Sequence, residues 1–133
     1  MVEPTHGKWV SAVFITFSGN CKKALTYYQT CFGGTLRFEM FEKPLPGYLE
    51  VPVVCGSLVS ERIIIHGSDL VHGEGRTLGN YLSIFLHCEN VDDRRVLIGA
   101  LGFNKKYTIA TGNHDQKLIE IIDAFDVRWI LGI

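Results

Sequence analysis

Hydrophobic and polar residues alternate over several short stretches of the chain, and each such stretch predicts a β-strand with one buried face. Turns that contain glycine or proline separate most of the stretches. The predicted strands cover residues 9–17, 35–42, 51–59, 61–66, 80–88, 105–111, 117–123 and 127–131. Pro44 and Pro46 exclude a central strand between the second and third stretches, and residues 67–79 form a longer turn-rich segment.

Two other stretches follow the period of a helix. Apolar residues recur at helical spacing within residues 24–32, between Asn20 and the pair Gly33-Gly34. Asn20 suits the N-cap because its side chain can accept a hydrogen bond from the first turn, and glycine can end a helix because it adopts positive φ at little cost. Residues 92–101 predict a second helix, which Asn90 caps in the same way.

The order of these elements occurs twice. An apolar strand that ends in Asn opens each half, at residues 12–20 and 82–90, and a helix, a glycine and a hairpin-like stretch follow it. Two βαβββ halves predict an α+β fold in which two open sheets enclose a cavity. We expect a single domain over residues 1–133, with one module at about 9–67 and the other at about 80–133.

Composition and charge exclude several classes of protein. The chain is 47% hydrophobic and carries a formal charge of −1, so neither disorder nor a basic nucleic-acid-binding surface is indicated. Its N-terminus has no apolar signal-peptide core, and no apolar run approaches the roughly 20 residues that cross a bilayer. We therefore expect a cytoplasmic protein that binds neither nucleic acid nor membrane.

The cysteines at positions 21, 31, 55 and 88 include no CxxC pair and no zinc-ribbon spacing. A disulfide framework is not expected in a chain of this length without a signal peptide, so we interpret all four as reduced, largely buried thiols. Cys21 lies near the start of the first predicted helix and precedes two lysines, which predicts a thiol more acidic than normal.

Three motifs resemble one family. Residues 17–28 (FSGNCKKALTYY), 31–34 (CFGG) and 123–129 (DAFDVRW) are similar, in order and spacing, to the signatures of the PhnB-like group. This group lies within the glyoxalase/bleomycin-resistance/dioxygenase, or vicinal oxygen chelate, superfamily. Ala124 and Asp126 replace the proline and glycine that are usual in the last motif. The resemblance implies the two-module fold with a ligand cavity and a homodimer.

The PhnB-like group is often labelled methyltransferase-like, but no Gly-rich strand-to-helix turn for S-adenosylmethionine is present, and no cofactor is expected. Metal-dependent relatives hold a divalent ion with His, Glu or Gln on the first and last strands of each half. The internal repeat locates these positions at Val13, Ile64, Ser83 and Ile130. Apolar side chains cannot bind a cation and one serine cannot hold it alone, so the resemblance predicts a site without metal.

An alternative depends on the register. Because side chains alternate with period two, a shift of two residues would put His66 or His87 on the same strand face as the expected metal positions. With Asp69 or Asp115 they would form a metal triad, and the protein would be a metal-dependent lyase or dioxygenase. In a third interpretation, the chain is a dimeric interaction module without a ligand. Whether it is an enzyme stays open.

Alternation along the strands also sorts side chains between the two faces. One set should pack under the helices: Phe14, Thr16, Ile63, Ile65, Ile84, Leu86, Trp129 and Leu131. The other combines apolar walls with a few polar groups, as small-molecule pockets do. Its candidate ligand-binding residues are Phe17, Arg62, His66, Ser83, Phe85, His87 and Arg128. We therefore expect a protein that binds a small, partly apolar molecule without metal.

Overall fold

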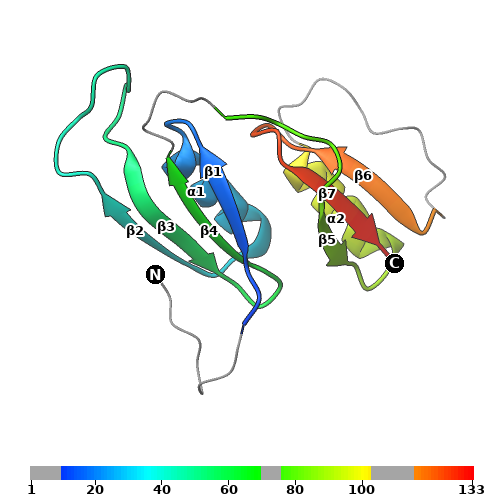
Figure 1. Cartoon of the computed structure of the whole chain (residues 1–133). Helices are drawn as coiled ribbons and strands as arrows, with labels where there is room; N and C mark the ends of the chain where they lie inside the picture. Colours follow the sequence, from blue (N-terminus) through cyan, green and yellow to red (C-terminus); the bar gives the residue numbers. More distant parts are fainter. Residues whose placement is uncertain (1–9, 70–75, 103–115) are drawn as a thin grey trace. The chain divides into compact units, whose positions relative to one another are not determined.

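The computed structural model describes residues 10–69, 76–102 and 116–133, and the chain divides into two compact units, Met1–Thr77 and Leu78–Ile133 (Figure 1). Each unit contains a small sheet and one helix, so the class is α+β, as predicted. No helix among the described residues is both long enough and apolar enough to cross a membrane.

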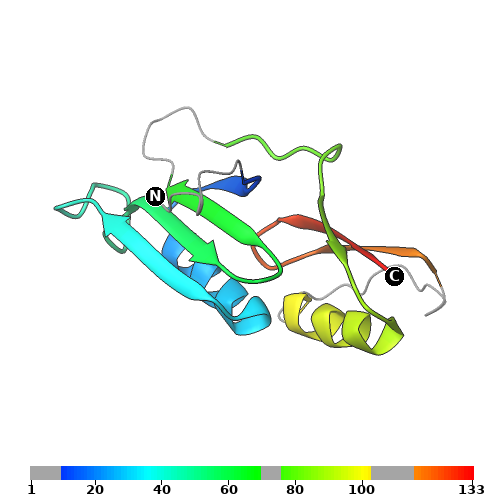
Figure 2. The same cartoon turned by 90° about the horizontal axis from the view of Figure 1, so that it is seen from below.

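The first unit is a βαβββ module. Its sheet has the strand order β1-β4-β3-β2, in which β1 pairs in parallel with β4 and the other pairs are antiparallel. α1 covers one face of this sheet and leaves the other, which we call its helix-free face, without a helix (Figure 2). The elements are β1 (Val13–Phe17), α1 (Cys21–Phe32), β2 (Thr35–Met40), β3 (Val53–Val59) and β4 (Ile64–Asp69).

The second unit repeats this arrangement over its described residues. Its sheet has the order β5-β7-β6, with β5 parallel to β7, as β1 is to β4 in the first unit. The elements are β5 (Ile84–His87), α2 (Val91–Leu101), β6 (Leu118–Ile122) and β7 (Arg128–Gly132). The strand predicted at residues 105–111 lies outside the described residues.

The helices are held by buried apolar side chains. In the first unit Phe17, Leu25 and Ile65 are completely buried, and in the second Trp129 and Leu131 are. Close packing of α1 depends on two glycines that pair across β3 and β4. A Cβ on Gly56 would lie 2.9 Å from Leu25 and 3.0 Å from the Phe38 ring, and one on Gly67 would lie 3.0 Å from the sulfur of Cys21. Glycine at both positions therefore lets the helix approach the sheet closely.

The two helices begin differently. Asn90 caps α2 as predicted: its Oδ1 accepts from the N–H of Asp93 at 2.8 Å. The predicted Asn20 cap is wrong, because the Asn20 side chain makes no capping hydrogen bond. Asp69 does this instead from the end of β4, where its Oδ1 accepts from the N–H groups of Gly19 (2.8 Å) and Cys21 (3.0 Å).

The predicted faces of β1 are also wrong. Val13 pairs with Ile65 and Phe17 with Asp69, so Val13, Ile15 and Phe17 lie on the helix side. Phe14 and Thr16 lie on the helix-free face. The repeat misled here because the last buried residue before the asparagine differs in its spacing between the two halves. In the second half it is Cys88, two residues before Asn90, and in the first it is Phe17, three residues before Asn20. The extra residue is accommodated next to Gly19, which has φ +103°.

Candidate functional site

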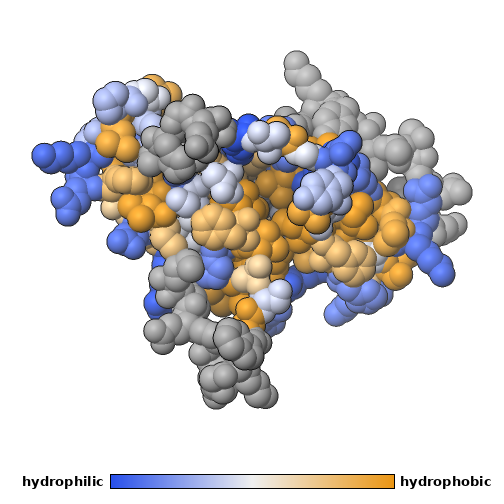
Figure 3. Space-filling model, viewed as in Figure 1, coloured by the Kyte–Doolittle hydropathy of each residue, from blue (hydrophilic) through white to orange (hydrophobic). Residues whose placement is uncertain are grey.

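The helix-free face of the first sheet carries a row of side chains that crosses all four strands. The strand register places Arg37 beside Ser57, Ser57 beside His66, and His66 beside Phe14. Adjacent strands lie about 4.8 Å apart, so three inter-strand spacings separate Arg37 at one end of the row from the exposed ring of Phe14 at the other. In Figure 3 this face combines hydrophobic and hydrophilic residues, as a pocket for a partly apolar molecule would.

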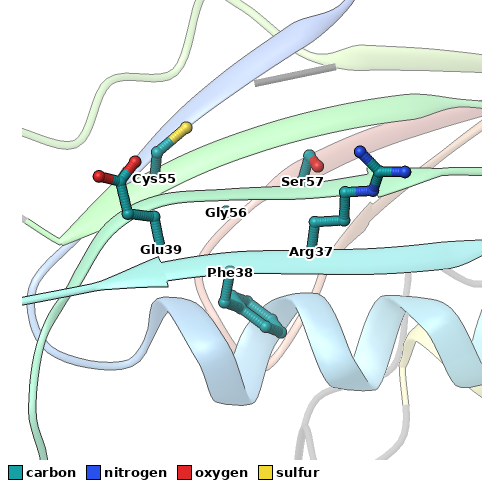
Figure 4. A pocket seen from close by; sticks show the side chains of 6 residues that line it. All are labelled: Arg37, Phe38, Glu39, Cys55, Gly56 and Ser57. Carbon is teal, nitrogen blue, oxygen red and sulfur yellow. The ribbon is translucent and has the colours of Figure 1, made fainter.

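A depression of about 140 Å³ lies at the β2–β3 end of this row. Arg37, Glu39, Cys55 and Ser57 point into it, away from α1, whereas Phe38 points toward the helix (Figure 4). The first two are exposed at the sheet edge, while Ser57 is only 3% exposed. A guanidinium, a carboxylate, a hydroxyl and a thiol therefore meet in a small volume.

His66 extends this polar group toward Phe14. Its ring is half-buried, and its Nδ1 atom is buried without a hydrogen-bond partner. An unpaired buried N–H is rarer than an unpaired acceptor, so the neutral ring is expected to carry its proton on Nε2. The imidazole then offers one N–H donor.

The helix-free face of the second sheet has a related but more fully paired set of residues. Phe85, His87 and Arg128 share it, and Phe85 is 57% exposed. The guanidinium of Arg128 donates to Glu120 at 2.7 Å, although its Nε is buried and unpaired. The Phe85 ring lies over Gly132, where an added Cβ would come within 2.8 Å of it. Phe85 therefore needs glycine at that position.

The predicted cavity residues fall into two groups. His66, Phe85, His87 and Arg128 lie on helix-free faces, and Ser83 is exposed just before β5. Two predictions need correction. Phe17 is completely buried on the helix side, and Arg62 lies in the turn between β3 and β4, which Ser60 closes through hydrogen bonds to Ile63.

The prediction also missed four residues of the depression: Arg37, Glu39, Cys55 and Ser57. A signal for two of them was present, because the alternation over residues 35–42 places Arg37 and Glu39 opposite the apolar face of that strand. No comparable signal marked Ser57 or Cys55, since their positions follow from the register between β2 and β3.

The residues at the metal positions of the superfamily do not fit a divalent cation. Ile64 and Ile130 have no donor atom, and the corrected face of β1 offers Phe14 and Thr16 in place of Val13. Within residues 10–69, 76–102 and 116–133, no three His, Cys, Asp or Glu side chains are grouped so that they could hold a metal.

The proposed triad with His66 and His87 loses one of its two candidate carboxylates. Asp69 is 5% exposed, lies on the helix side, and accepts three backbone hydrogen bonds, the third from Val53 at 2.8 Å. It therefore cannot join His66 on the opposite face. Asp115 lies outside the described residues.

Cys21 is not an activated thiol. Burial, together with smaller effects of the nearby Asp69 and Cys55 in the same direction, raises its pKa from 9.0 to about 12. The predicted acidic thiol is therefore wrong, because desolvation outweighs the helix N-terminus. All four cysteines are free, as predicted; Cys21 and Cys88 are buried, while Cys31 and Cys55 are partly exposed.

Solved structures share this architecture. A PhnB protein from Bacillus cereus superposes with a TM-score of 0.72 over 92% of this chain and 97% of its own, at 16% identity. Protein PA1353 from Pseudomonas aeruginosa gives 0.73 over 94% and 97%, at 21% identity. A glyoxalase/bleomycin resistance/dioxygenase superfamily member from Sphaerobacter thermophilus gives 0.52 over 93% and 97%, at 16% identity. The chain has the glyoxalase/bleomycin-resistance fold.

No protein-family model matches the sequence, and no curated protein is significantly similar to it. At these identities the likeness establishes the glyoxalase/bleomycin-resistance fold alone. It agrees with the family to which the three sequence motifs pointed. The chemistry has to be argued from the residues of this chain.

Proposed function

We propose that this protein binds a small, partly apolar molecule on the helix-free faces of its sheets, without a catalytic metal. The observation that carries the proposal is a pair of exposed phenylalanines at matching places in the two units. Phe14 is 56% exposed on β1 and Phe85 is 57% exposed on β5. Phe14 follows Val13, which pairs with the buried Ile65 of β4. In the same way Phe85 follows Ile84, which pairs with the buried Trp129 of β7.

The surroundings of these rings support a ligand. An exposed aromatic residue on a sheet face marks a surface that a ligand or a partner can cover. His66 is the register partner of Phe14, with Ser57 one strand further along, and Arg128 is on the same face as Phe85, so each ring has polar groups on its face that could orient a bound molecule. As the family resemblance implies, the binding protein would be a homodimer.

A neutral fluorescent probe, N-phenyl-1-naphthylamine, tests the proposal. We expect saturable fluorescence enhancement with the intact protein and about three- to tenfold weaker binding for Phe14→Ala and Phe85→Ala, since each ring supplies aromatic contact. Leu49→Ala is the matched control, because Leu49 is fully exposed in the loop before β3. Equal probe affinity in all four proteins would contradict the proposal.

The same variants separate binding from a pure interaction module. If the phenylalanines served only to join two chains, their replacement would lower the native mass and leave probe affinity per folded chain unchanged. Light scattering on the titrated samples distinguishes the two results.

A further inference from the structure

Arg37 differs from the other arginines of the chain. All six lie within the described residues, and five have polar partners. Arg76 donates to the Thr16 carbonyl and Arg94 to the Lys117 carbonyl, while Arg95 pairs with Asp92 and Arg128 with Glu120. The side chain of Arg37 makes no hydrogen bond or ion pair with a described residue, although Glu39 lies on the same face of the same strand. Its guanidinium is available for a ligand.

The residues next to Arg37 complete a set of donors. Ser57 is its register partner on β3, and His66 is the register partner of Ser57 on β4. The hydroxyl of Ser57, the expected Nε2–H of His66 and the guanidinium can all donate to the same kind of acceptor. The depression in Figure 4 gives an oxyanion room beside Arg37 and Ser57.

We propose that Arg37, Ser57 and His66 bind the carboxylate of a small molecule whose apolar or aromatic part lies on Phe14. This inference rests on the proposed function and names its ligand class. A guanidinium binds carboxylate and phosphate with similar geometry. Glu39 decides between them, because its negative charge two residues from Arg37 on the same face repels a dianion more than a monoanion.

Three probes that each carry one phenyl ring test the proposal: 3-phenylpropionate, its neutral counterpart 3-phenyl-1-propanol, and phenyl phosphate. Two-dimensional NMR titration of the full chain gives both affinity and location. We expect 3-phenylpropionate to bind most tightly and to shift amide signals of β2, β3 and β4. Arg37→Gln should weaken its binding by about tenfold, the loss expected for a charge-assisted hydrogen bond, and leave the alcohol unchanged. Arg95→Gln, the same change on an exposed part of α2, should have no effect.

A gain of affinity provides a second test that misfolding cannot imitate. Glu39→Gln removes the repelling charge, so it should strengthen phenyl phosphate binding more than 3-phenylpropionate binding. If the acid and the alcohol bind equally well to the unaltered protein, or Arg37→Gln leaves the acid unchanged, the carboxylate site is wrong even though the sheet face binds small molecules. If no probe binds while N-phenyl-1-naphthylamine does, the carboxylate site is again wrong. If that dye also fails to bind, the proposed function itself is wrong.

Discussion

At the scale of single residues, burial decides the chemistry of this protein more than neighbouring charge does. Cys21 follows the start of a helix and precedes two lysines, features that normally make a thiol acidic. The structure places it at 0% exposure against Gly67, beside the carboxylate of Asp69. Ionising this thiol would bury a negative charge next to another, and the residue is therefore a packing element.

The raised pKa of Cys21 makes stability fall in alkaline solution. An unfolded thiol ionises near pH 9, whereas the folded one stays protonated up to about pH 12. Between these pH values the unfolded state thus binds fewer protons than the folded state. The contribution of the Cys21 thiol to stability is complete below pH 9 and is lost as the pH rises toward 12. From pH 9 to 10 the free energy of unfolding should drop by about 1 kcal/mol more than in Cys21→Ser. Parallel curves from urea unfolding at both pH values would contradict this.

Sequence could place most single residues but not their partners. Alternation correctly put Trp129 and Leu131 in the core and Phe85 outside, because β5 and β7 keep a regular pleat. It failed for Phe14 and Phe17, where one extra residue before α1 shifts the phase. That the Arg37 guanidinium has no partner among the described residues could not be predicted, since it depends on which residue of β3 lies beside it, and this follows from the strand register.

At the scale of elements, two buried carboxylates hold backbone segments in place, Asp69 between distant parts of the chain and Asp123 within one turn. Asp69 ties the end of β4 to the start of α1 and to Val53 at the beginning of β3. Asp123 is completely buried, accepts from the N–H groups of Phe125 and Val127, and bonds the indole of Trp129 at 2.8 Å. Each carboxylate accepts three hydrogen bonds from its own unit in place of hydrogen bonds from water.

Replacing the Asp69 cap should be costly, and replacing the expected Asn20 cap should not be. Asp69→Ala leaves three backbone N–H groups without their acceptor, so we expect the free energy of unfolding to fall by about 3 kcal/mol. Asn20→Ala is the control at the same helix end, and its effect should stay within about 0.5 kcal/mol because its side chain caps nothing. Urea unfolding measures both. A loss near 1 kcal/mol for Asn20→Ala would restore it as the cap.

At the scale of the whole molecule, duplication explains both what was predicted and what was missed. The repeated order of strand, helix and hairpin predicted the α+β class, and the structure adds that the first strand of each unit pairs with the last. Residue-by-residue transfer between the halves was less reliable, because the two copies have diverged at their strand-to-helix junctions.

The proposal for the whole molecule is a metal-free homodimer. Protein purified without chelators should contain well below one equivalent of Ni, Zn, Fe or Mn per chain, since the superfamily positions offer Ile64, Ile130 and Ser83. Its mass by light scattering should be twice that of the 14.9 kDa chain. A full equivalent of metal that disappears in His66→Ala would establish the lyase or dioxygenase alternative, and a monomer would remove the dimer.

The parallel pairing of β1 with β4 has a consequence for synthesis on the ribosome. Val13 pairs with Ile65, about 50 positions later, so β1 has to wait for its sheet partner β4 until nearly the entire unit has been translated. Meanwhile Phe17, which the finished unit buries, stays open to chaperones or to unwanted association. Long-range closure of this type also slows folding. The nascent chain should therefore become protease-resistant late and in one step, after Asp69 has left the exit tunnel.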